Sequence, residues 1–231
     1  MMPDLRIYGR SPLSAAVIHG GPGAAGEMAP VARRLSSTRG VLEPLQTAST
    51  LDGQVTELKD VLEAKGDLPV TLIGFSWGAM LSFILAARHP SVVRKLVLVG
   101  SPPFEEEYAA GIMSTRLNRL SHDQREDALS LLQRLEDPGH PDKNTLMARL
   151  GELLAAADSY DALPCDSEIV EYRHDIYKRV WEQAAKLRRS GKLLRLGEKI
   201  KCPAVAIHGD HDPHPGEGVR RPLSRVLKDF R

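Results

Sequence analysis

Residues 70–89 contain the feature that most restricts what this chain can fold into. An apolar run at 70–73 has the composition of a buried strand, and the run at 77–89 has the length and apolar content of a helix. Between them the sequence G-F-S-W-G, at 74–78, fits the pattern G-x-S-x-G. A serine at a sharp turn from strand to helix is typical of a nucleophile held clear of a sheet. We therefore predict that Ser76 is a catalytic nucleophile; the alternative is a glycine-rich turn with an incidental serine.

Apolar runs that resemble buried strands recur along the chain, and most of them end at a glycine. The clearest of the others lie at 15–19, 96–99 and 204–208, with weaker ones at 5–8 and 41–45. Helical patterns at 25–36 and 55–65 lie between these runs. Strands that alternate with helices at this spacing indicate a mostly parallel α/β sheet flanked by helices.

The alternation is interrupted after the two prolines at 102–103. From 104 to 200 we find helical periodicity and no convincing strand. Ser121 and Gln124 form a capping-box pattern, and Asn144 is predicted to cap a further helix. We therefore predict three parts: residues 1–103 form the first part of an α/β core, 104–200 form an inserted all-helical cap, and 201–231 return to the core.

The overall charge and the cysteine content exclude several classes of function. Lysine and arginine number 31 against 30 acidic residues, a formal net charge of +1, so we expect neither a nucleic-acid partner nor binding to an anionic membrane. No apolar stretch is long enough to span a bilayer. Cys165 and Cys202 lack metal-ligand spacing, and we interpret both as reduced thiols of a cytoplasmic protein. The sequence indicates no cofactor and no metal.

A glycine-rich loop, H-G-G-P-G at 19–23, follows the apolar run at 15–18. Its backbone N–H groups are suited to a developing negative charge, as acyl transfer requires. A phosphate cradle is the alternative, but neither G-x-x-x-x-G-K nor G-x-G-x-x-G is present. His19 is a tempting catalytic base; we interpret it as a structural residue that fixes the loop.

The loop at 19–23 together with the motif at 74–78 resembles the α/β-hydrolase superfamily, most closely its proline iminopeptidase-like branch. The resemblance covers the whole core, and it implies the α/β-hydrolase fold with a cap inserted at 104–200. It also implies an acyl-enzyme mechanism in which two backbone amides form the oxyanion hole. Carried over to this sequence, those amides are the ones of Gly21 and Trp77.

The resemblance also places an acid just after a late strand and before a proline. The segment 209–215, G-D-H-D-P-H-P, matches this pattern, so Asp212 is the implied triad acid. Asp210 is the second choice, because an aspartate beside a glycine is typical of a turn. The histidines and aspartates here also allow a metal site, although the serine machinery already accounts for them.

No residue of this sequence matches the family's catalytic histidine. Only nineteen residues follow Asp212, and His214 is the one histidine among them. We expect that His208, His211 and His214 do not substitute, because the base must lie between the acid and the serine. We also expect that the C-terminal strand, the histidine loop and the final helix are missing. That would leave an open sheet edge, suited to pairing with a second copy in a homodimer.

The leading hypothesis is therefore a cofactor-free serine hydrolase that cleaves a carboxylic ester or a small amide through an acyl-enzyme. Its partner would be a small-molecule ester or a short peptide. A proline iminopeptidase-like aminopeptidase remains open, with the acidic run at 105–107 as a candidate site for a substrate amine. So does a catalytically impaired hydrolase-fold binding module. A lyase or carbon–carbon hydrolase using the same residues is a minor alternative.

Overall fold

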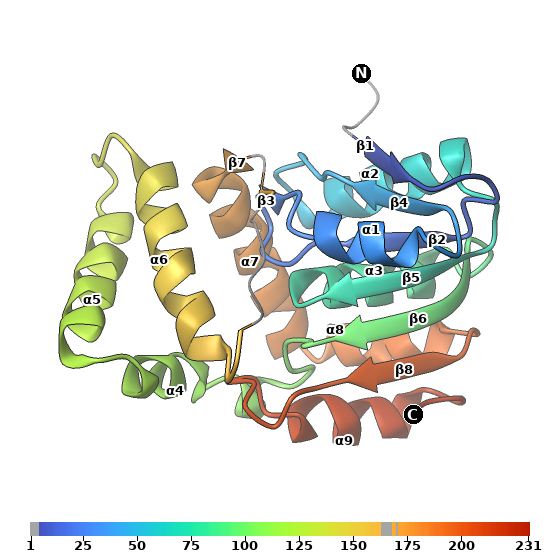
Figure 1. Ribbon diagram of the computed structural model, residues 1–231. Helices are drawn as coiled ribbons and strands as arrows, with labels where there is room; N and C mark the ends of the chain where they lie inside the picture. The colour runs from blue at the N-terminus through green and yellow to red at the C-terminus, as the bar shows by residue number, and fades with distance from the viewer. Residues whose placement is uncertain (1–4, 163–167, 170) are drawn as a thin grey trace.

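A six-stranded sheet forms the centre of the protein (Figure 1). The computed structural model describes residues 5–162, 168–169 and 171–231. The strand order is β1-β4-β2-β5-β6-β8. The strands are β1 (Leu5–Tyr8), β2 (Ala15–Ile18), β4 (Val41–Pro44), β5 (Val70–Phe75), β6 (Val93–Val99) and β8 (Ala204–Ile207). Only β1 pairs in antiparallel fashion, and the other ladders are parallel. The predicted α/β-hydrolase-type fold with a mostly parallel sheet is confirmed.

Helices cover both faces of this sheet. The helices of the core are α1 (Ala29–Leu35), α2 (Leu51–Lys65), α3 (Trp77–Arg88) and α9 (Glu217–Val226). The main hydrophobic cluster joins one face to α2, α3 and α9, and a smaller cluster joins the other face to α1. Helix α3 is buried along nearly its whole length, which is why its sequence is apolar all round rather than amphipathic.

Two helix boundaries differ from those predicted. The helix expected at 25–36 begins only at Ala29, because the preceding residues Ala24–Ala25 form a short strand, β3. The helix expected from 55 begins at Leu51, because the side chain of Thr50 accepts a hydrogen bond from the amide of Gly53 and caps its first turn.

The helical segment, residues 104–200, contains the other helices of the described residues. They are η1 (Glu106–Tyr108), α4 (Ile112–Arg119), α5 (His122–Glu136), α6 (Lys143–Asp158), α7 (His174–Arg189), α8 (Lys192–Arg195) and η2 (Leu196–Lys199). The capping box of Ser121 and Gln124 is present at the start of α5. The predicted cap of α6 was wrong: Asp142 caps it, accepting from the amide of Thr145, and Asn144 lies inside the helix.

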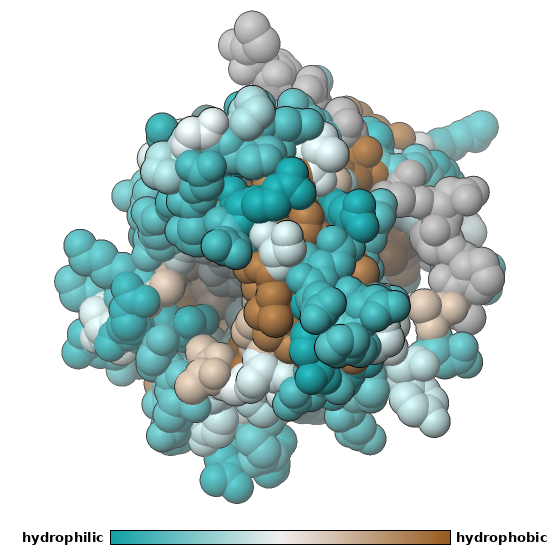
Figure 2. Space-filling model, turned by 90° about the vertical axis from the view of Figure 1, so that its left-hand side faces the viewer, coloured by the Kyte–Doolittle hydropathy of each residue, from teal (hydrophilic) through white to brown (hydrophobic). Residues whose placement is uncertain are grey.

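Hydrophobic packing divides the helical segment into two parts. Helices α4, α5 and α6 share a cluster of their own, which includes Ala128, Leu131 and Leu150. Helix α7 instead packs through Ile176 and Val180 into the main core. In Figure 1, α4, α5 and α6 therefore form a lobe on the side to which the arrowheads of β5, β6 and β8 point. Figure 2 views this side: hydrophilic side chains cover most of it, and a strip of hydrophobic ones runs down its middle.

The helical segment is not entirely helical. Residues Glu171–Tyr172 form a short strand, β7, that pairs antiparallel with β3. The expectation of an all-helical cap is corrected to this extent. A two-residue strand is too short to produce a visible alternation of polar and apolar side chains, so the sequence pattern could not reveal it.

The outer edge of β8 is partly covered by residues 229–231. The amides of Ala204 and Ala206 donate to the carbonyl oxygens of Asp229 and Arg231, each at 2.9 Å. Phe230 forms a parallel bridge with Ala204, so this segment runs in the direction of the other central strands. Within the described residues, no helix combines the length and the apolar character needed to cross a membrane.

Candidate active site

Ser76 lies at the turn between β5 and α3, in a strained backbone conformation. Its φ and ψ angles are 49° and −116°, and among the described residues it is the one non-glycine with a positive φ. Such a conformation costs of the order of 1–3 kcal/mol and persists only where the surroundings enforce it. Here the amide of Ser76 donates to the carbonyl oxygen of Val99 at 2.9 Å, which fixes the turn to the end of β6.

The two glycines of the motif are required by close backbone contacts. A Cβ atom on Gly74 would lie 2.2 Å from the carbonyl oxygen of Gly78. A Cβ atom on Gly78 would lie 2.2 Å from the carbonyl oxygen of Ile18, at the end of β2. Any side chain at either position would therefore displace the backbone. These contacts explain why the turn needs the spacing G-x-S-x-G, and they bring the start of α3 against the loop that follows β2.

Trp77 contributes its backbone rather than its side chain to the candidate site. The indole is fully buried, its Nε1–H donates to Oε1 of Gln54 at 2.9 Å, and its ring meets Trp181 of α7 edge to face at 5.5 Å. As the first residue of α3, Trp77 carries an amide that the helix itself does not satisfy. That amide and the positive end of the helix dipole favour negative charge beside Ser76.

The glycine-rich loop after β2 is held on two sides. The amide of Gly20 donates to Oε2 of Glu27 at 2.8 Å. On the other side, the amide of Arg173 donates to the carbonyl oxygen of Gly23 at 2.8 Å. Gly21 lies between these anchors with a φ of 48°. The loop is thus fixed from within the core and from the end of β7, in the helical segment.

Glu27 is a residue of this site that the sequence reasoning missed. Burial raises the pKa of its carboxyl group, and the hydrogen bond from Gly20 lowers it by less, so the pKa lies above its usual range. The sequence signal that could have identified Glu27 is an acidic residue a few positions after a glycine-rich loop, because the backbone amides of such a loop need hydrogen-bond acceptors. Glu27 thus fixes the peptide group next to Gly21, whose amide is the one expected in the oxyanion hole.

His19 is fully buried next to this loop. Its Nδ1 lies 2.7 Å from the carbonyl oxygen of Gly20, and burial lowers its pKa, so the ring is held neutral. In this position it contacts the backbone of the loop, which is the contact that a structural role requires.

The loop after β8 holds Asp212 near the end of β6. Its carboxylate lies beside Gly100, where an added Cβ atom would be 3.1 Å from Oδ2 of Asp212 and 3.3 Å from Cε2 of Phe75. Gly100 therefore lies between the carboxylate of Asp212 and the ring of Phe75, the residue that precedes Ser76. Asp210, the other candidate, is exposed on the same loop. Of the two candidates, Asp212 is the one whose carboxylate lies beside Gly100, at the end of β6.

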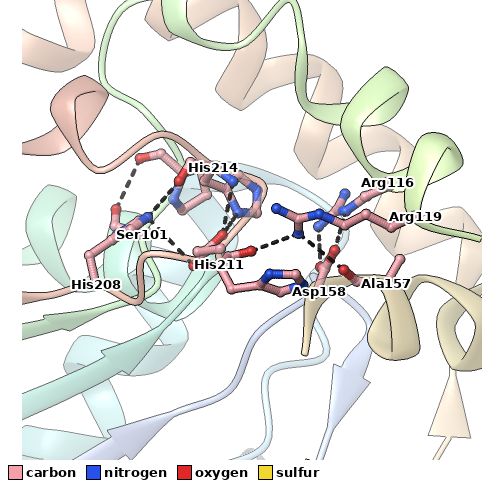
Figure 3. A network of polar contacts seen from close by, with 10 residues as sticks. Ser101, Arg116, Arg119, Ala157, Asp158, His208, His211 and His214 are labelled. Atoms are coloured by element: carbon pink, nitrogen blue, oxygen red, sulfur yellow. Dashed lines mark hydrogen bonds and ion pairs between the residues drawn. The ribbon is translucent and has the colours of Figure 1, made fainter. Parts of the chain in front are cut away.

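Two histidines, His214 and His208, contact Asp212; Figure 3 labels both histidines. Nδ1 of His214 lies 2.7 Å from Oδ1, and Nε2 of His208 lies 3.5 Å from Oδ2. Burial raises the pKa of Asp212. The hydrogen bonds from the ring and the amide of His214, together with the nearby charges, lower it by more, so the pKa lies below its usual range. In the described part of the chain, no histidine is hydrogen-bonded to Ser76. These residues also hold no group of three His, Cys, Asp or Glu side chains suited to a metal ion.

Arg119 of α4 connects the lobe to the loop that carries Asp212. Its Nη1 donates to the carbonyl oxygens of His211, at 2.6 Å, and Ala157, at 3.1 Å. Next to it, Arg116 forms a two-pronged ion pair with Asp158. Figure 3 shows these contacts in one continuous network with the histidines of the loop.

The sheet order, the strained serine turn and the glycine-rich loop can be compared with known proteins. A family model described as alpha/beta hydrolase fold matches residues 2–214. The chain belongs to this family. Similar solved structures include a proline iminopeptidase of Mycobacterium smegmatis, which is 20% identical with a TM-score of 0.61; the match covers 98% of this chain and 84% of that one. At that identity the likeness shows the alpha/beta hydrolase fold alone.

Curated relatives in sequence include an esterase and an epoxide hydrolase. Pimeloyl-[acyl-carrier protein] methyl ester esterase of Chromobacterium violaceum is 29% identical over 177 residues, 74% of this chain. Human epoxide hydrolase 4 is 36% identical over a shorter stretch, 52 residues or 22% of this chain. The matched regions span 62% of the esterase and 14% of the epoxide hydrolase.

Proposed function

We propose that this protein is a serine hydrolase that cleaves a carboxylic ester through an acyl-enzyme. The observation that carries this proposal is the backbone of Ser76, which is held at a positive φ between the end of a buried strand and the start of a buried helix. Strain of this kind is retained where it serves a function, and here it holds a hydroxyl at the positive end of α3.

The steps of the reaction follow from the residues around Ser76. The Ser76 hydroxyl attacks the ester carbonyl, and the amides of Gly21 and Trp77 donate to the oxygen that becomes negative. Collapse of this intermediate expels the alcohol and leaves an acyl-serine, which water then hydrolyses. The serine proton passes to an imidazole base, which returns it to the leaving alcohol; Asp212 would orient that imidazole, and no histidine of the described residues is yet identified as this base. His214 and His208 contact this acid but are not hydrogen-bonded to Ser76.

An ester is the favoured substrate class because a relative that matches most of this chain is named as an ester hydrolase. The aminopeptidase alternative rests on a structural likeness at 20% identity, which shows the fold alone. We further propose that residues 104–200 act as a cap that selects the substrate, since their lobe lies on the side to which the strands of the core point.

A catalytically impaired binding module is the second candidate. It is favoured by one observation: among the described residues, no imidazole is hydrogen-bonded to Ser76. The two functions differ in covalent chemistry, because a binding module would retain an ester without cleaving it.

Pre-steady-state hydrolysis of a short p-nitrophenyl ester separates the two. A serine hydrolase should release a burst of p-nitrophenol of up to one equivalent per protein, and Ser76→Ala should remove it. Proline β-naphthylamide, tested in parallel, should be cleaved much more slowly than the ester. Saturable binding of the ester without any Ser76-dependent release would support the binding module instead.

A further inference from the structure

A cavity of about 460 Å³ lies in the helical segment, away from Ser76. Its wall is formed by the loop between α5 and α6 and by the first turns of α6 and α7, and its lining includes His140, Lys143, His174, Lys178 and Arg179. The volume is within the range of small-molecule sites. None of the lining residues belongs to the machinery described above.

The wall of the cavity is held together by hydrogen bonds between these three pieces. The amide of His174, at the start of α7, donates to Oδ1 of Asn144 in α6 at 3.0 Å. The amide of Asp142 donates to Nδ1 of His140 at 3.2 Å, and Nζ of Lys143 donates to the carbonyl oxygen of Leu135 at 2.8 Å. The cavity is therefore built by the fold rather than left between unconnected side chains.

The charge of the lining is predominantly positive. Its two acids are already engaged: Asp142 caps α6, and Asp175 pairs with Arg173 at 3.3 Å. Within the described residues, no ion pair engages the cations Lys143, Lys178 and Arg179. In addition, α6 and α7 both begin at this cavity, and the N-terminal end of a helix carries partial positive charge.

The titration of His174 reflects the same surplus of positive charge. Desolvation lowers its pKa, and the nearby charges of Lys143 and Lys178 lower it further. Asp175 and Glu136 act in the opposite direction with smaller effect. An anion placed among these groups would relieve the repulsion, so it would raise the pKa of His174.

We propose that this cavity binds a small polyanion of the phosphate class, such as a pyrophosphate or a phosphate ester. Lys178 and Arg179 project from the first turns of α7, and Lys143 lies at the start of α6, so three cationic groups line one volume. An arginine guanidinium can donate two parallel hydrogen bonds to a phosphate group, and the lysines add compact positive charge. The site would be a second ligand site, separate from the ester site.

Inorganic pyrophosphate is the probe with which to test this by titration calorimetry at about 0.15 M salt. We expect a single site with a Kd below about 1 mM. The double variant Lys178→Ala/Arg179→Ala should weaken binding by at least about tenfold, since it removes two charge-assisted contacts. The matched control is Lys186→Ala/Arg189→Ala, which removes two exposed cations from the far end of the same helix. This control should retain the wild-type Kd within about twofold.

Nitrogen-15 NMR of the histidine side chains, with His174 assigned through His174→Asn, supplies a second measurement. Saturating pyrophosphate should raise the pKa of His174 and leave that of His19 unchanged. Absence of binding, or equal weakening in both double variants, would overturn the proposal. Reaction of Ser76 with an active-site probe should be the same in all variants, so the failure of either proposed function can be recognised separately.

Discussion

The imidazole of His214 lies directly against the carboxylate of Asp212, with Nδ1 2.7 Å from Oδ1. The backbone amide of His214 donates to the same oxygen at 2.9 Å. One oxygen of the proposed triad acid is thus occupied by its own loop. Oδ2, which faces Gly100 and lies 3.5 Å from His208, is the oxygen nearer to the end of β6.

This arrangement predicts a pH dependence of stability. Because the folded protein lowers the pKa of Asp212, its ionised form stabilises the fold above the pKa of the unfolded state, about 4. That contribution is lost as the pH falls through the lower, folded pKa. Asp212→Asn should therefore reduce the free energy of unfolding by roughly 1 kcal/mol at pH 6, and by less at pH 3. Urea unfolding at both pH values measures this, and an equal loss at both would contradict it.

The strained backbone of Ser76 predicts different stabilities for two variants that both lose activity. Ser76→Ala and Ser76→Gly should both abolish ester hydrolysis, with losses of roughly 10⁴-fold or more in kcat. Glycine adopts a positive φ without steric cost, whereas alanine retains the strain. The free energy of unfolding of Ser76→Gly should therefore exceed that of Ser76→Ala by about 1 kcal/mol, as measured by urea unfolding. Equal stability of the two variants would argue against strain at this turn.

The hydrogen bond from the Gly20 amide to Glu27 predicts that Glu27 positions the glycine-rich loop at 19–23. Glu27→Gln keeps an oxygen that can accept from the Gly20 amide, whereas Glu27→Leu leaves that amide without an acceptor. The leucine variant should lose about tenfold or more in kcat, with a smaller change in KM, and the glutamine variant should retain most activity. Steady-state kinetics on a p-nitrophenyl ester tests this, and equal activity of the two variants would exclude the role.

The ionisation of Glu27 should make stability depend on pH in the direction opposite to that of Asp212. The fold raises the pKa of Glu27, so folded protein binds its proton more tightly and stability falls as the pH rises from the unfolded pKa, near 4.3, through the folded one. Glu27→Gln removes this loss. The variant should gain stability relative to wild type between pH 4 and pH 8, as measured by urea unfolding at the two pH values.

The sequence predicted the parts of the fold whose signals are long and local. The strands at 70–75 and 204–207 are apolar runs that end near a glycine, and the turn at Ser76 has a fixed spacing. The sequence did not reveal β7, which is two residues long and pairs with a strand far away in the chain. Nor did it show that α7 packs into the main core, because an amphipathic helix has the same pattern on a cap as on a core.

The candidate site was predictable where one motif carries both the residue and its geometry. Ser76 and the loop at 19–23 are of this kind. Glu27 was not, because its role depends on a tertiary contact with the amide of Gly20. The resemblance alone favoured Asp212 over Asp210, but the position of the Asp212 carboxylate beside Gly100 depends on the folded loop and could not be read from the sequence.

Free imidazole should act as a base for Ser76, because no histidine of the described residues is hydrogen-bonded to this serine. Imidazole added at millimolar concentration should raise the rate of p-nitrophenyl ester hydrolysis above the sum of its own solution rate and that of the protein. Ser76→Ala is the control, since it retains the fold but lacks the nucleophile. An equal increase with wild type and Ser76→Ala would show that the imidazole acts only in solution.

The central claim is that Ser76 is a nucleophile, and covalent labelling with a fluorophosphonate tests it most directly. The labelled protein is digested and the modified peptide is identified by mass spectrometry, with and without added imidazole. We predict one phosphonylated residue, Ser76, a faster reaction with imidazole, and loss of the label in Ser76→Ala but not in Ser101→Ala. A folded protein that carries no label on Ser76 under either condition would contradict the claim.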